Sequence, residues 1–138
     1  MIKTISMQDI RYLNLFNKIT NINTRYFFKY NEMLVFAVPK NLVKKALGKD
    51  AENIREIGKT LRKKIRIVPI PEGTEDAKDF FGKIVDPTSF KDLEVKNDEI
   101  IITAGNMNKA ALIGRNKRRL IELQKISKDF FERDLRIV

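Results

Sequence analysis

Apolar residues along this chain follow a helical spacing and then a strand spacing, in an order that occurs twice. The first helical stripe falls at i, i+3, i+4 and i+7 and comprises Tyr12, Leu15, Phe16 and Ile19. Ser6 precedes this helix, and Asp9 three residues later completes the pattern of a capping box. Two apolar runs then predict a pair of strands joined by a turn at Asn31-Glu32, namely Thr24–Tyr30 and Met33–Val38.

The remainder of the first half predicts two helices and a third strand. A short helix is expected over Asn41–Leu47, ending at Gly48. A second helix is expected over Ala51–Arg62, because its apolar residues share one face: Ile54, Ile57 and Leu61. Lys64–Val68 predicts a strand closed by Pro69. The Pro/Gly-rich segment 69–73 is the natural boundary, so we expect two domains, 1–70 and 71–138.

Beyond this boundary the same order returns. Thr74 is expected to cap a helix whose apolar stripe is Ala77, Phe80, Phe81 and Ile84. The elements expected after Asp86-Pro87 are strands at Lys91–Lys96 and Glu99–Ala104, helices at Met107–Ile113 and Lys117–Phe131, and a strand at Arg133–Val138. The predicted fold class is α+β, with the order helix–strand–strand–helix–helix–strand in each domain.

A glycine between two short helices recurs with an offset of 66 residues, as Gly48 and Gly114. An aliphatic residue precedes each glycine, and a basic residue, Lys49 or Arg115, follows it. Repetition at a fixed offset indicates duplication of a structural unit. Backbone amides at such a helix N-terminus favour phosphate, so each glycine loop is a candidate site for a nucleic-acid backbone.

This element order, with a Gly-x-x-x loop between the second and third helices, resembles the type II KH domain, and the tandem resembles the archaeal NusA-like transcription factors. The resemblance covers essentially the whole chain, but the expected Gly-x-x-Gly motif has Ala51 or Lys117 at its fourth position. It implies two type II KH domains, each with a three-stranded mixed sheet covered on one face by helices. It also implies single-stranded RNA as ligand, RNA polymerase as a partner, and a role in transcription elongation, termination or antitermination. The polymerase-binding and S1 modules of the bacterial factors are expected to be missing.

The second loop suits an RNA backbone best. Its candidate RNA-binding residues are Gly114, Arg115, Asn116, Lys117, Arg118 and Arg119, and no acidic residue lies between Lys109 and Leu120. Cations in a first helical turn oppose the helix dipole unless an anion binds there. The alternative is a solvated helix start. Leu112, Ile113 and Leu120 are expected to line the groove beside the loop or its floor, with Glu99–Ala104 as the neighbouring strand.

The first loop, Gly48-Lys49-Asp50-Ala51, carries an acid where a phosphate is expected. In the KH family an aspartate in this loop abolishes RNA binding, so the resemblance leaves open whether this loop binds RNA. The alternative is that Asp50 caps the next helix. Lys44 and Lys45 precede the loop and are further candidate RNA contacts.

Composition narrows the class of protein. The chain of 138 residues has no Cys and no His, which removes thiol nucleophiles, histidine acid–base chemistry and the usual zinc sites. We therefore expect neither an enzyme nor a cofactor, metal or small-molecule substrate. No apolar run reaches membrane-spanning length, and Met1–Ser6 has no signal-peptide core. The expected location is the cytoplasm, with no membrane partner.

The net charge of +10 is unevenly distributed. Residues 1–70 hold 15 Lys/Arg and 5 Asp/Glu, whereas residues 71–138 hold 13 of each sign. Such a field favours a polyanion, although a Lys-rich solvated surface of thermophilic type is the alternative. Aromatic side chains in the first predicted strand are candidates for stacking on bases or for the core: Tyr26, Phe27, Phe28 and Tyr30.

Two rival functions remain open. A ribosome-associated or RNA-processing KH protein would bind RNA in the same way and differ only in its partner. A protein–protein adaptor whose loops no longer bind RNA is favoured by Asp50 and disfavoured by the basic run Arg115–Arg119.

Overall fold

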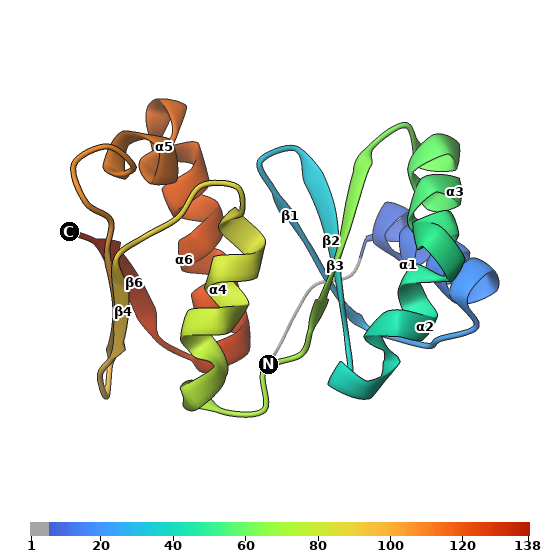
Figure 1. Cartoon of the computed structure of the whole chain (residues 1–138), viewed down its shortest axis with the longest axis horizontal. Helices are drawn as coiled ribbons and strands as arrows, with labels where there is room; N and C mark the ends of the chain where they lie inside the picture. Colours follow the sequence, from blue (N-terminus) through green and yellow to red (C-terminus); the bar gives the residue numbers. More distant parts are fainter. Residues whose placement is uncertain (1–5) are drawn as a thin grey trace. The chain divides into compact units, whose positions relative to one another are not determined.

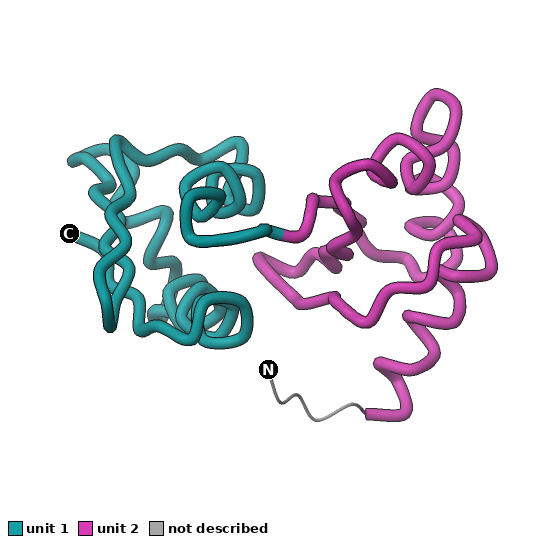
Figure 2. The backbone as a smooth tube through the Cα atoms, turned by 90° about the horizontal axis from the view of Figure 1, so that it is seen from below, with its two compact units in different colours: residues 1–2, 71–138 teal, residues 3–70 magenta. Residues whose placement is uncertain are grey.

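The computed structural model describes residues 6–138, which divide between Ile70 and Pro71 into an N-terminal and a C-terminal unit (Figure 2). The absence of a signal peptide was expected from Met1–Ser6, and of these residues Met1–Ile5 lie outside the described part. Within residues 6–138, no helix combines the length and the apolar character needed to cross a membrane.

The N-terminal unit packs its helices on one face of a three-stranded sheet (Figure 1). The central strand β2 pairs antiparallel with β1 and parallel with β3, so the sheet is mixed. Its elements are α1 (Met7–Thr20), β1 (Tyr26–Tyr30), β2 (Met33–Val38), α2 (Val43–Leu47), α3 (Glu52–Leu61) and β3 (Lys64–Pro69).

The C-terminal unit repeats this topology. The central strand β5 pairs antiparallel with β4 and parallel with β6. Its elements are α4 (Ala77–Val85), β4 (Asp92–Val95), β5 (Glu99–Thr103), α5 (Lys109–Ile113), α6 (Arg118–Phe131) and β6 (Asp134–Ile137). The α+β fold with two three-stranded mixed sheets, and the element order predicted twice from the sequence, are therefore confirmed.

Each unit has its own aromatic core, built from the predicted helical stripes. In the N-terminal unit, Phe16 of α1 stacks on Phe36 of β2 with ring centroids 4.5 Å apart. In the C-terminal unit, Phe80 of α4 lies 4.9 Å from Phe130 and 5.8 Å from Phe131 of α6. Burying such rings together with aliphatic residues such as Leu34 and Ile100 stabilises a unit of about 70 residues.

The two predicted helix caps have different outcomes. The capping box at Ser6 is confirmed, because Ser6 Oγ accepts from the Asp9 amide at 3.1 Å and Asp9 Oδ2 accepts from the Ser6 amide at 3.2 Å. The prediction that Thr74 caps α4 was wrong. It begins a 3₁₀ turn, Thr74–Asp76, that leads into α4, and no side chain caps that turn. Asp76 instead accepts from the Glu72 amide at 2.9 Å, which ties the start of α4 to the preceding segment.

Candidate nucleic-acid interface

The two glycine loops have the same backbone conformation. Gly48 has φ 76° and ψ 177°, and Gly114 has φ 78° and ψ 170°. The third and fourth loop residues are left-handed in both copies: Asp50 and Ala51 have φ of 52° and 58°, and Asn116 and Lys117 have φ of 56° and 60°. In each loop the fourth amide donates to the glycine carbonyl at 3.2 Å. The duplication seen in the sequence therefore extends to the loop geometry.

The left-handed fourth residue is the position that carries glycine in the intact motif. A non-glycine residue there costs roughly 1–2 kcal/mol. Ala51 and Lys117 nevertheless keep the left-handed conformation, so neither substitution has made the turn helical. The expectation that Asp50 caps the next helix was wrong, because Ala51 is the N-cap of α3 and no side chain caps that helix.

A second shared feature is a hydrogen bond across each loop. Asn53 Nδ2 donates to the carbonyl of Lys45 at 3.3 Å in the first copy. Arg119 Nη1 donates to the carbonyl of Ala111 at 3.0 Å in the second. Both donors stand five residues after the loop glycine, and both acceptors stand three residues before it. The longer helix of each hairpin is thereby tied to the shorter one.

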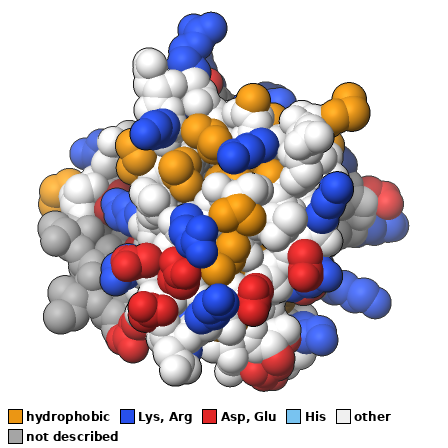
Figure 3. All heavy atoms as spheres, turned by 90° about the vertical axis from the view of Figure 1, so that its left-hand side faces the viewer, with side chains coloured by type: hydrophobic (Ala, Val, Ile, Leu, Met, Phe, Trp, Pro, Cys, Tyr) orange, Lys and Arg blue, Asp and Glu red, His pale blue; other side chains and the backbone are white. Residues whose placement is uncertain are grey.

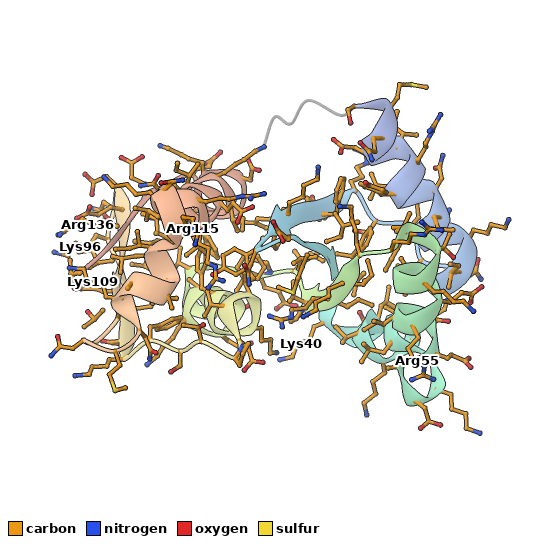
Figure 4. All side chains as sticks on the ribbon, turned by 90° about the horizontal axis from the view of Figure 1, so that it is seen from above. Lys40, Arg55, Lys96, Lys109, Arg115 and Arg136 are labelled. Atoms are coloured by element: carbon orange, nitrogen blue, oxygen red, sulfur yellow. The ribbon has the colours of Figure 1, made fainter. Side chains whose placement is uncertain are left out.

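The second loop presents cations and unbonded amides together. Arg115, Asn116, Lys117 and Arg118 are exposed, while Gly114 and Arg119 are half-buried. Within residues 6–138, no hydrogen bond partner is found for the amides of Arg115 and Asn116. Consecutive amides of this kind at the positive end of the 14-residue helix α6 can bind an anion. Figure 4 labels Arg115 here and Arg55 in the first copy.

The three apolar residues expected at the groove or its floor differ in their exposure. Leu112 is fully buried and belongs to the core, whereas Ile113 and Leu120 are half-buried and remain accessible. The strand packed against both α5 and α6 is β6. Gln124 of α6 also donates to the carbonyl of Leu135 in β6 at 3.2 Å. Glu99–Thr103 forms the central strand β5, and β6 pairs with it at the edge of the sheet.

The first loop is chemically different despite its equal geometry. Lys44, Lys45, Lys49 and Asp50 are exposed, and Gly48 and Ala51 are half-buried. Arg55 of α3 donates to the main-chain carbonyl of Asp50, which places a guanidinium group at the loop. The equivalent position in the second copy is Ile121, whose side chain is exposed. The first loop therefore combines an exposed acid, Asp50, with exposed lysines, whereas the second has no acid.

The aromatic residues of β1 do not form a solvent-exposed surface on which bases could stack. Phe27 belongs to the core, with its ring 5.9 Å from Tyr12 and 5.8 Å from Phe36. Phe28 and Tyr30 are also buried, and Tyr26 is half-buried. Of the two roles open for these residues, the core is the one observed for Phe27.

Charged side chains elsewhere on the C-terminal unit are mixed in sign. Figure 3 shows one face of the molecule with Lys, Arg, Asp and Glu side chains interspersed. Ion pairs such as Lys78–Asp92 at 3.2 Å and Arg136–Glu99 at 3.1 Å account for part of this mixing. Among residues 6–138 no ion pair involves Arg115 or Lys117, so these two positive charges stand together at the loop.

Comparison with known proteins places the chain in a family. It is 31% identical over 100 residues to the probable transcription termination protein NusA of Methanococcus vannielii. The chain is a NusA-like protein. The alignment covers 70% of this chain and 56% of the relative, so the chain spans little more than half the length of the protein it matches. No family model matches the chain.

A solved structure supports the fold of this NusA-like chain. The crystal structure of APE1850 matches it with a TM-score of 0.65 and 18% sequence identity. The match covers 97% of this chain and 99% of that one. At such low identity the likeness shows the fold alone, which is two α+β units, each with a three-stranded mixed sheet.

The sequence analysis missed one residue that contributes to the geometry of the loops. Asn53 was not among the candidates, and Arg119 was expected to contact RNA, yet both side chains bond across their loops. The signal was present in the two copies, because positions 53 and 119 both carry an N–H donor directly before the apolar positions Ile54 and Leu120.

Proposed function

We propose that the chain consists of two type II KH domains and binds single-stranded RNA as a NusA-like factor that modulates transcription elongation and termination, including antitermination. It acts in the cytoplasm, without catalytic activity or a cofactor, and RNA polymerase is its protein partner. The observation that carries this proposal is the repeated loop geometry, with unbonded amides and cations at Arg115–Lys117.

The chemistry of RNA explains why this geometry suits it. KH domains hold about four nucleotides, with the glycine loop on the backbone. The positive φ of Gly114 turns the backbone into the loop. The amides of Arg115 and Asn116 then bind the phosphate, and the Arg115 and Lys117 side chains add charge-assisted hydrogen bonds. The half-buried Ile113 and Leu120 supply an apolar surface for bases.

The two loops have unequal roles in this proposal. The second loop makes the principal phosphate contacts, through Gly114, Arg115, Asn116, Lys117 and Arg118. The first loop, Gly48–Ala51, contributes less, because the carboxylate of Asp50 repels phosphate. Lys44, Lys45 and Lys49 still attract the strand non-specifically.

The experiment uses a matched pair of loop variants. Arg115→Asp combined with Asn116→Asp gives the second loop the sequence Gly-Asp-Asp, and Lys49→Asp gives the same sequence to the first loop. Aspartate tolerates the left-handed conformation of position 116, so the backbone is retained. We expect the double variant to weaken binding about tenfold or more, since its carboxylates repel phosphate and form no charge-assisted hydrogen bond with it. Lys49→Asp should weaken it less.

The measurement is fluorescence anisotropy with a pool of single-stranded RNA at low salt, with circular dichroism as a check of folding. Equal or reversed losses of affinity would contradict the assignment of the second loop. No binding by the unaltered chain at micromolar concentration would favour the adaptor, for which Asp50 is the supporting feature. Crosslinking in cells separates the remaining rival, since ribosomal RNA rather than nascent transcripts would indicate a ribosome-associated protein.

A further inference from the structure

The side chain five residues after each loop glycine fills the space that a Cβ on the glycine would need. A Cβ added at Gly48 would lie 2.8 Å from Asn53 Nδ2 and 2.9 Å from its Cγ. A Cβ added at Gly114 would lie 2.8 Å from Arg119 Cγ and 3.0 Å from its Cβ. These side chains therefore cross directly over the glycine before reaching the carbonyl of Lys45 or Ala111.

The same hydrogen bond is made by two chemically different residues. An amide in one copy and a guanidinium group in the other donate to equivalent carbonyls, although their charges differ. A charge-assisted contact with phosphate would need a cation in both copies, whereas a bond to a main-chain carbonyl requires only an N–H donor of suitable reach. The shared property of the two residues is thus the bond across the loop.

We infer that Asn53 and Arg119 are positioning residues, which fix the left-handed corner of each loop in place of the second glycine of the motif. Non-glycine residues persist in such conformations only where the surrounding structure over-determines them. The bond from the longer helix to the shorter one supplies that constraint for Ala51 and Lys117. The consequence for RNA rests on the proposed function, while the structural role does not.

Amide hydrogen exchange in the full chain tests the structural role. The reporters are the Gly114 amide, bonded to the Ala110 carbonyl, and the Lys117 amide, bonded to the Gly114 carbonyl, with the Val138 amide in the sheet as reference. Arg119→Ala should raise exchange at both reporters about tenfold relative to the reference, because the loop opens locally. Arg119→Asn, which installs the donor of the first copy, should restore protection.

A second variant pair separates this role from a general loss of folding. Lys117→Gly removes the penalty of the left-handed corner, so exchange in the Arg119→Ala background should return towards that of the unaltered chain. The inference is overturned if Arg119→Ala leaves exchange unchanged. It is equally overturned if Arg119→Asn behaves as the alanine variant does, or if Lys117→Gly gives no recovery.

The salt dependence of RNA binding supplies an independent readout. Arg115→Asn and Arg119→Asn remove the same charge from neighbouring positions. For single strands the logarithmic salt slope falls by about 0.7 for each phosphate that the protein no longer neutralises. We expect that fall for Arg115→Asn and none for Arg119→Asn. An equal fall for both variants would identify Arg119 as a phosphate ligand and overturn the inference. Failure of the unaltered chain to bind RNA would refute the proposed function, while exchange still decides the role of Arg119.

Discussion

Gly114 combines two requirements that no other residue type meets. Its φ of 78° is left-handed, and an added Cβ would meet the side chain and the amide nitrogen of Arg119 within 3.0 Å. We expect Gly114→Ala to destabilise the C-terminal unit by about 1–3 kcal/mol, since strain and overlap combine. Urea denaturation followed by circular dichroism measures this loss.

Gly82 provides the matched control for that substitution. It lies inside α4, and nothing comes within 4 Å of a Cβ built on it. Gly82→Ala should stabilise the chain by roughly 0.5–1 kcal/mol, because alanine loses less backbone entropy in a helix. If both variants lost the same stability, the overlap with Arg119 would not be the cause.

At this scale the sequence predicts positions better than conformations. Gly48 and Gly114 were found from their offset alone, and their neighbours were correctly placed in a loop. The left-handed Ala51 and Lys117 could not be predicted, because local propensity disfavours that conformation and only the bond across the loop compensates. Asp50 failed as a cap for the same reason, since the left-handed corner moves the N-cap to Ala51.

At the scale of elements, the cap of α1 carries a measurable part of the stability of the N-terminal unit. Ser6 and Asp9 each satisfy an amide at the start of α1. Ser6→Ala should cost about 1 kcal/mol, because one of the free amides of the first turn loses its partner. Thermal or urea denaturation of the full chain reports the change.

Thr74 supplies the corresponding control at the second helix start. It begins the 3₁₀ turn that leads into α4, but its side chain makes no capping bond. Thr74→Ala should therefore change stability by less than about 0.5 kcal/mol, the range typical of surface substitutions. A loss as large as that of Ser6→Ala would show that the two helix starts are equivalent after all.

Elements were predicted well where periodicity was strong and less well where it was weak. The stripes of α1 and α4 carry large apolar residues at helical spacing, and both helices form where expected. The short helices were predicted too long, since a 3₁₀ turn occupies residues 40–42 and a turn occupies residues 106–108. A run of five to seven residues has too few turns for a period to mark its ends.

At the scale of the whole molecule, charge and loop chemistry favour different units. The excess of 10 positive charges lies in residues 1–70, whereas the loop without an acid lies in residues 71–138. Charge attracts a polyanion over a distance of about a Debye length, but backbone amides select geometry only on contact. A strand that bound both units would therefore be attracted mainly by one and positioned mainly by the other.

The salt dependence of binding tests this division directly. Lys44 and Lys45 are exposed on α2 beside the first loop. Replacing both with Gln should reduce the logarithmic salt slope by about 1.4, at about 0.7 for each phosphate neutralised on a single strand. The control replaces Lys78 and Lys83 of α4 with Gln, because these lysines pair with Asp92 at 3.2 Å and Asp79 at 3.1 Å. The control should leave the slope unchanged. If the Lys44 and Lys45 variant also kept the full slope, the N-terminal charge would be a solvated surface, and RNA would be held by the C-terminal unit alone.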